Sequence, residues 1–98
     1  MFRSDFIRSI SDVELTDIMV NYFTEVMALY NLFGEDNEFD VIKGNIDNGS
    51  ITFYITFNSE SNVEEIVNYI NGKKFTFYNT YCTIDAIQNK NTIILRLI

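Results

Sequence analysis

The sequence predicts one α+β domain over residues 1–98, with two helices packed on one face of an antiparallel sheet. Two capping-box patterns each precede a run of apolar residues at helical spacing. An Asp-Asn-Gly-Ser sequence marks a hairpin between alternating segments, and the C-terminal quarter alternates as strands do. The predicted order is therefore α-β-β-α-β-β, and 98 residues suit a single core.

The first predicted helix covers residues 12–33. Ser11 and Glu14 occupy the capping-box positions, in which the serine hydroxyl accepts a hydrogen bond from the Glu14 N–H. Apolar residues then recur at helical intervals as far as Phe33. Gly34 follows them and tolerates the left-handed conformation in which many helices end.

The second predicted helix covers residues 62–71 and carries the same signals. Ser61 and Glu64 form its capping box, and Gly72 ends it. Its apolar stripe is narrow, which is typical of a helix lying on a sheet.

A hairpin is predicted between the two helices. A two-residue turn centred on Asn48-Gly49 pairs Ile46 with Ile51 and, farther along, Ile42 with Ile55 and Asp40 with Phe57. In strand 50–57, alternation directs one set of side chains to the core (Ile51, Phe53, Ile55 and Phe57) and the other to the opposite face (Thr52, Tyr54 and Thr56).

The remaining strands are predicted at 73–78, 81–87 and 92–98. The break at Asn79-Thr80 is weak, so the pattern leaves open whether 73–87 forms one bent strand or two.

Composition excludes most catalytic chemistry. The chain contains no histidine, which excludes Ser-His and Cys-His dyads and histidine metal sites, and it has no glycine-rich phosphate loop. Its single cysteine, Cys82, lies in a predicted strand and is interpreted as a small buried apolar residue. We expect no enzymatic activity and no cofactor. A lone cysteine and short apolar runs also favour a cytoplasmic protein that does not span a membrane.

The segment that follows the first helix is the best candidate for a metal site, but it departs from the calcium-loop pattern. Asp36, Glu38 and Asp40 match the first ligand positions of an EF-hand. Val41 then replaces the required glycine, and Asp47 replaces the final bidentate glutamate. We therefore expect no metal and interpret the segment as a solvated acidic loop.

Negative charge is concentrated in the first three quarters of the chain. Residues 9–72 contain twelve acidic residues and one basic residue, within a total net charge of −7. Such asymmetry bears on partners and solubility. The candidate partner-binding residues are carboxylates of the loop and the first helix: Glu35, Asp36, Glu38, Asp40, Asp12, Asp17 and Glu25.

The first helix carries more apolar surface than packing on a sheet requires. Val13, Val20 and Met27 recur every seven residues and add a second stripe beside the main one, for a combined arc of roughly 220° at about 100° per residue. This stripe is either covered within the chain or forms a dimer interface.

Residues Gly49 to Phe75 resemble the second half of an RNA-recognition motif. The strand Thr52-Phe53-Tyr54-Ile55-Thr56-Phe57 precedes a helix that ends in Asn71-Gly72-Lys73-Lys74-Phe75. Tyr54 matches one of the two stacking aromatics of that family, whereas Thr52 replaces the other. The resemblance spans about a quarter of the chain, and we interpret it as a shared α/β pattern rather than kinship. Strand alternation separately predicts Lys43 beside Tyr54 on the open sheet face, joined there by Tyr78 or Tyr81. Lys43, Tyr54 and Tyr78 are therefore the candidate contacts of a sheet that binds single-stranded nucleic acid.

The sequence thus favours a small acidic interaction protein without catalytic activity. Its expected partner is a basic protein surface, such as that of a nucleic-acid-binding protein, which carboxylates occupy in place of phosphates. Abundant Asn, Ile, Phe and Tyr suggest an AT-rich genome, and the chain is similar in general character to phage-encoded inhibitors of host defence, which act in the host cytoplasm. Net acidity argues against direct nucleic-acid binding. The alternatives are the sheet-based nucleic-acid binder and a homodimer formed through the first helix.

Overall fold

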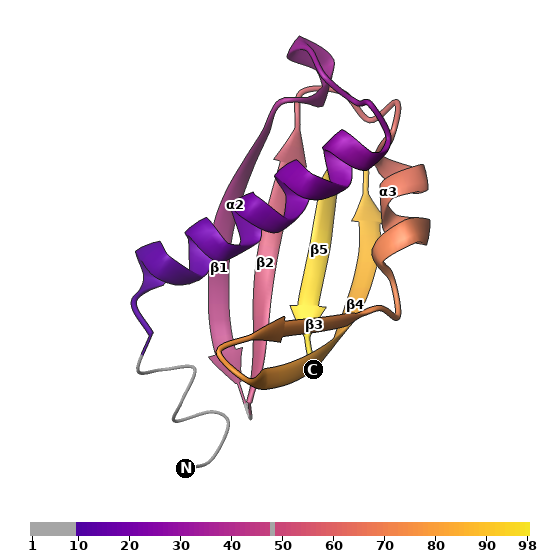
Figure 1. Cartoon of the computed structure of the whole chain (residues 1–98). Helices are drawn as coiled ribbons and strands as arrows, with labels where there is room; N and C mark the ends of the chain where they lie inside the picture. The colour runs from indigo at the N-terminus through magenta and orange to yellow at the C-terminus, as the bar shows by residue number, and fades with distance from the viewer. Residues whose placement is uncertain (1–9, 48) are drawn as a thin grey trace.

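The computed structural model describes residues 10–47 and 49–98 and confirms the α+β architecture. A five-stranded antiparallel sheet forms one layer, with strand order β1-β2-β5-β4-β3. The two helices form the other layer: α2 crosses β1, β2 and β5 diagonally, and α3 stands beside β4 (Figure 1). The elements are α2 (Asp12–Leu29), a 3₁₀ turn η1 (Glu35–Asn37), β1 (Phe39–Asp47), β2 (Ser50–Phe57), α3 (Val63–Ile70), β3 (Lys74–Phe77), β4 (Thr80–Asn89) and β5 (Thr92–Leu97).

The core lies between the helices and one face of the sheet. Alternate residues of β2, β4 and β5 are buried there, beginning with Ile51, Cys82 and Ile93, together with the inner stripes of both helices. Strand β3 folds across the lower end of the helix side, where Phe75 is buried against the edge of the Tyr22 ring at 5.0 Å between centroids. The segment 73–87 is therefore two strands, which are joined through Tyr78 and Asn79 at φ 49° and 63°.

Helix α2 begins as predicted but ends four residues earlier. The Ser11 hydroxyl accepts from the Glu14 N–H at 3.1 Å, so the first cap is confirmed. At the other end Asn31 adopts φ 54°, and the Leu32 N–H donates to the Met27 carbonyl at 2.9 Å. This is a Schellman motif, in which asparagine takes the place usually held by glycine. The predicted stop at Gly34 was wrong because Asn31 satisfies the orphan carbonyls first.

The predicted capping box of the second helix is not formed. Asn62 is the N-cap residue and makes no side-chain cap hydrogen bond; its amide instead donates to the Asn37 side chain at 2.9 Å. The Ser61 hydroxyl lies 2.7 Å from that of Ser59. The Ser61 hydroxyl that the sequence assigned to the cap is therefore used in a turn contact, and the side chain of the actual N-cap residue makes a tertiary contact.

The hairpin register agrees with the prediction near the turn and then shifts by one residue. Ile46 pairs with Ile51 as predicted, while Asn48 of the predicted turn lies outside the described residues. A β-bulge at Gly44 and Asn45 then places Val41, rather than Ile42, opposite Ile55. Because strand side chains alternate, the shift reverses the faces of all residues beyond it.

The bulge has a clear physical advantage. Phe39, rather than Asp40, lies opposite the buried Phe57, so β1 contributes an aromatic ring to the core and keeps its carboxylate in solvent. Burial of an unpaired carboxylate would cost several kcal/mol.

Gly44 provides the space that this bulge needs. A Cβ atom added there would lie 3.0 Å from Cε2 of Tyr54 and 3.1 Å from the Thr52 carbonyl oxygen. Since that oxygen belongs to the backbone of a paired strand, it cannot move without disturbing the sheet. We expect Gly44→Ala to lower the free energy of unfolding by about 1–3 kcal/mol, measured by urea denaturation. Asn45→Ala is the control, and equal stability of the two variants would contradict this account.

Candidate protein-interaction surface

Both helices present acidic side chains and no basic ones. Helix α2 contains four carboxylates and α3 contains two, and neither helix sequence includes Lys or Arg. These side chains are exposed: Asp12, Glu14, Asp17, Glu25, Glu64 and Glu65. The helix layer is therefore a negatively charged surface that faces away from the sheet.

A second acidic group lies at the end of the molecule where β1 begins. Exposed side chains of η1, β1 and the β2–α3 loop form it, and we call this group the acidic end: Glu35, Asp36, Glu38, Asp40 and Glu60. Among the described residues, the turns at this end also contain one basic side chain, Lys90. Four of the five carboxylates are those that the sequence predicted, and Glu60 comes from a segment more than twenty residues away.

Hydrogen bonds hold the two loops of the acidic end together. The Asn58 side-chain amide donates to the Glu35 carbonyl at 2.8 Å, and its backbone N–H donates to the Glu38 carbonyl at 3.1 Å. The Ser59 N–H donates to the Asp36 carbonyl at 3.2 Å. These bonds use the backbone oxygens of the acidic residues, so the carboxylates themselves stay directed to solvent.

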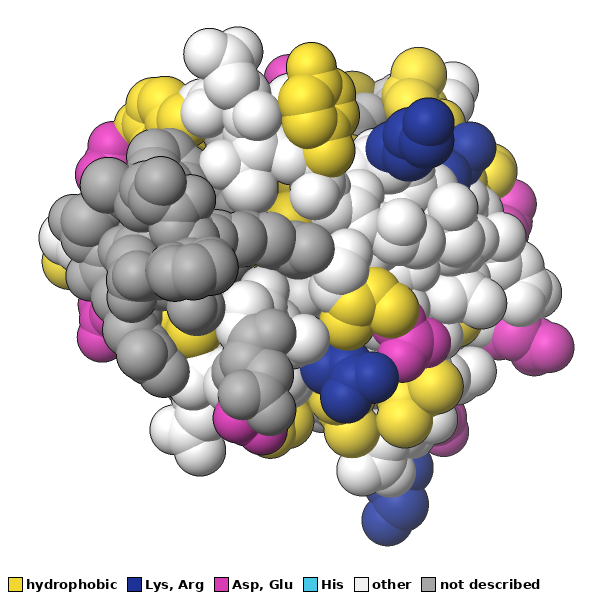
Figure 2. Space-filling view, turned by 90° about the horizontal axis from the view of Figure 1, so that it is seen from below, with side chains coloured by type: hydrophobic (Ala, Val, Ile, Leu, Met, Phe, Trp, Pro, Cys, Tyr) yellow, Lys and Arg dark blue, Asp and Glu magenta, His cyan; other side chains and the backbone are white. Residues whose placement is uncertain are grey.

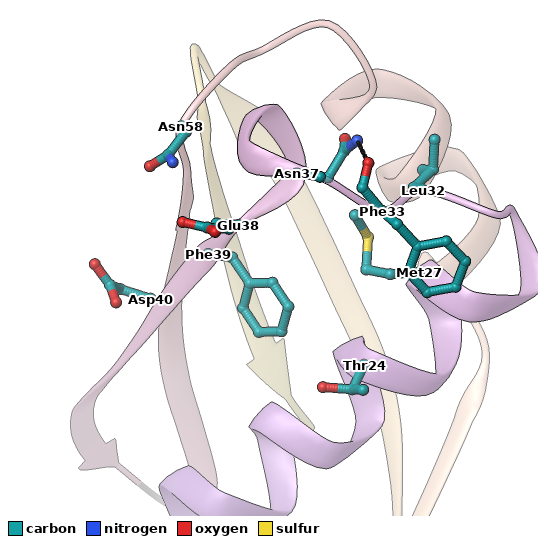
Figure 3. A pocket seen from close by; sticks show the side chains of 10 residues that line it. Thr24, Met27, Leu32, Phe33, Asn37, Glu38, Phe39, Asp40 and Asn58 are labelled. Carbon is teal, nitrogen blue, oxygen red and sulfur yellow. Dashed lines mark hydrogen bonds between the residues drawn. The ribbon is translucent and has the colours of Figure 1, made fainter.

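An open cleft of about 450 Å³ adjoins the acidic end. Its apolar wall comes from the end of α2, the following turn and β1: Met27, Leu32, Phe33 and Phe39. Figure 3 shows the Phe39 ring directed toward α2, whereas the carboxylates of Glu38 and Asp40 lie on the other side of the strand. Phe33 is 69% exposed although it is a large apolar residue. The cleft thus combines an accessible aromatic side chain with a negatively charged rim.

The predicted residues of α2 do not form a single site with the acidic end. Asp12 lies 3.3 Å from the Lys43 ammonium, whose side chain is only 15% exposed beneath the start of the helix. Asp17 lies near the same N-terminal end, whereas Glu25 is exposed near the C-terminal end. Of the three predicted residues of α2, Glu25 is therefore the one that lies on the half of the helix lining the cleft.

The second apolar stripe of α2 is covered at its C-terminal end and exposed at its N-terminal end. Met27 is 4% exposed and belongs to the core, and Val20 is half-buried. Val13 alone of the three is exposed, at 72%. The chain itself therefore covers Met27, which is one of the two alternatives that the sequence left open for this stripe.

The three residues predicted for the open sheet face are separated. Tyr54 lies on that face. Lys43 lies on the helix-covered side, because the bulge places it opposite the buried Phe53. Tyr78 lies in the β3–β4 turn, where its hydroxyl donates to the Glu14 carboxylate of α2; this hydrogen bond raises the pKa of the phenol. The arrangement expected for a nucleic-acid-binding sheet is thus not assembled from these side chains.

The described residues also bear on metal binding, on a phenol with a raised pKa and on membrane insertion. No group of three or more Asp, Glu or Cys side chains there is placed to hold a metal ion. Burial raises the pKa of Tyr22, with a smaller contribution from Tyr69, and this phenol belongs to the core contact with Phe75. No helix among these residues is both long enough and apolar enough to cross a membrane.

Lys and Arg side chains occur mainly away from the acidic end. Figure 2 views the molecule from below, the opposite end, and shows Lys and Arg in small separate groups among uncharged and acidic side chains. Lys73 lies 4.4 Å from the centre of the Tyr69 ring, and Arg96 lies 3.7 Å from the Asp85 carboxylate. Away from the acidic end, the described basic side chains are therefore interspersed with carboxylates.

Comparison of the chain with family models, with curated proteins and with solved structures found no match. The functional argument therefore depends on the residues and their geometry.

Sequence reasoning missed two contributors to this surface. Glu60 joins the acidic end only because the two loops are hydrogen-bonded, and no sequence pattern predicts those bonds. Phe33 was predicted as the last apolar residue of the first helix, but the helix ends at Leu29 and leaves the ring exposed in the turn. The Asn31 residue is the signal that could have indicated this earlier end.

Proposed function

We propose that this chain is a small acidic interaction domain that occupies a basic surface of a partner protein, at a place where that partner otherwise binds nucleic acid. The supporting observation is the segregation of charge: the helix layer and the acidic end present carboxylates, whereas most described Lys and Arg side chains lie elsewhere. Clustered Lys and Arg that neutralise phosphates also attract clustered carboxylates.

The cleft beside the acidic end supplies a point of attachment. Long-range attraction accelerates encounter but gives little specificity. Most interfaces obtain their affinity from a few buried aromatic or apolar anchors. Phe33 is exposed, and the cleft wall behind it is apolar, so an apolar side chain of the partner can be buried there while its basic neighbours meet Glu38 and Asp40. The bound partner loses access to nucleic acid, which makes the domain an inhibitor.

Competition with nucleic acid tests this function directly. The tagged full-length chain captures its partner from a lysate of source or host cells at low salt, and the partner is then purified. Double-stranded DNA or single-stranded RNA should displace the partner from the immobilised chain, and raising the salt from about 0.1 to about 0.5 M should release it, because both act on the same charged contacts. A partner whose binding responds to neither treatment would rule out occupation of a nucleic-acid site.

A further inference from the structure

An uninterrupted apolar row crosses the open face of the sheet. Strand pairing in the sheet places Ile42 of β1 beside Tyr54 of β2, Tyr54 beside Ile94 of β5, and Ile94 beside Ile87 of β4. We call these four residues the apolar row. Ile42 and Ile87 are 63% and 58% exposed, Tyr54 is 41% exposed, and Ile94 between them is partly exposed. Four neighbouring strands thus contribute one accessible apolar side chain each, at one level of the sheet.

The β-bulge of β1 helps to build this row. It turns Ile42 outward, and Gly44 leaves room for the Tyr54 ring to lie against the backbone of β1. Both helices and β3 pack on the opposite side of the sheet, so no element among residues 10–47 and 49–98 covers the row (Figure 1). Contiguous apolar surface of this kind usually marks an interface.

The surroundings of the row carry fewer carboxylates than the acidic end. On one side lie Thr52, Arg96 and Asp85, of which the last two form an ion pair at 3.7 Å. On the other side lie Asp40, Thr56 and Thr92, and the two threonine hydroxyls are 3.1 Å apart. The carboxylates of this face that Arg96 does not pair with are Asp40 and Asp47, fewer than the acidic end presents. A strongly basic partner therefore has fewer contacts to gain there.

We propose that the open sheet face binds a second copy of this chain, with the two apolar rows packed on each other about a twofold axis that runs along the row. A patch that is apolar at its centre and polar at both margins is self-complementary in this arrangement. The strand positions then place Arg96 opposite Thr92, Asp85 opposite Asn89, and Asp40 opposite the bulge of the second copy. None of these three pairs sets like charges against each other, and the two acidic ends point in opposite directions.

The expected dimer is weak because the face is small. Strands about 4.8 Å apart and residues about 3.4 Å apart give a four-strand face of about 400 Å² per copy. This is about half the area that each partner buries in a standard stable interface. We expect a dissociation constant on the order of 10–100 μM. Salt should tighten the dimer, since it screens the repulsion between two acidic chains. Salt should weaken binding to a basic partner, which is the opposite effect. The dimer and the basic partner are therefore tested independently, and failure of one proposal does not imply failure of the other.

Sedimentation velocity of the full chain from about 5 to about 500 μM tests the proposal. The sedimentation coefficient should rise with concentration, and more steeply at high salt. Ile87→Lys should weaken the dimer at least about tenfold, because a twofold axis along the row brings two ammonium groups together in an apolar contact. Ile42→Lys provides a second variant from the other end of the row.

Val13→Lys is the matched control, because Val13 is at least as exposed as Ile42 and Ile87 but lies on α2. It should leave the dimer unchanged, whereas disruption by Val13→Lys alone would move the interface to the first helix and overturn the proposal. Circular dichroism verifies that each variant is folded. A chain that stays monomeric at every concentration would also overturn it.

Discussion

Phe23→Ala is expected to lower the free energy of unfolding by about 3–5 kcal/mol, the largest effect of any single substitution considered. Phe23 is fully buried, and its ring centroid lies 6.0 Å from that of Phe39 and 6.4 Å from that of Phe57. The three rings join α2 to the first two strands directly beneath the cleft. Alanine would leave a cavity that rigid strands cannot fill, so both the lost contacts and the void contribute to the cost.

Domains of this size usually have a stability of about 5–15 kcal/mol, so the variant should be close to unfolding at 37 °C. A loss of 3–5 kcal/mol corresponds to a fall in Tm of about 15–30 °C at this length. Phe33→Ala, at a ring that is 69% exposed, is the control and should cost less than about 1 kcal/mol. Thermal melts of both variants, followed by circular dichroism, measure the difference. Similar melting temperatures would mean that the aromatic cluster does not couple the helix to the sheet.

Local signals predicted most of this fold because they depend on neighbouring residues alone. The Ser11 cap, the Ile46–Ile51 pair and the alternation of β2 all follow from patterns a few residues long, and the structure confirms each of them. The two-layer arrangement then follows, since both helices and the sheet must bury their apolar faces.

Features that depend on distant contacts could not be predicted in this way. The bulge at Gly44 follows from the need to keep Asp40 out of the core, which becomes apparent only once β1 is laid against the buried Phe57. Ser61 was predicted to cap the second helix, yet Asn62 occupies the N-cap position and its amide donates to Asn37, twenty-five residues away. The same limit applies to function: four carboxylates of the acidic end were visible in the sequence, but the cleft beside them and the apolar row on the sheet exist only in the folded chain.

Neutralising the acidic end is expected to weaken binding of the proposed basic partner by about 10- to 100-fold at low salt. The variant Glu35→Gln, Asp36→Asn, Glu38→Gln removes three exposed carboxylates and keeps the backbone carbonyls that accept from Asn58 and Ser59. The loops should therefore retain their conformation, and the loss reflects charge alone. Close charged pairs across an interface contribute about 1 kcal/mol or more each, which supports this range. Isothermal titration calorimetry with the purified partner measures the change.

The control makes three substitutions at exposed positions outside the helix layer and the acidic end: Asp47→Asn, Thr83→Lys, Asp85→Asn. Its net charge changes by the same amount, so a general effect of acidity would weaken the partner equally with both variants. We expect less than about a threefold change for the control, because long-range attraction alone is screened within about 10 Å at 0.1 M salt. Adding Glu60→Gln to the first variant should weaken binding further, since the hydrogen-bonded loops bring Glu60 into the same group. If both triple variants lost the same affinity for the partner, total charge would explain the loss, and a specific acidic site would be contradicted.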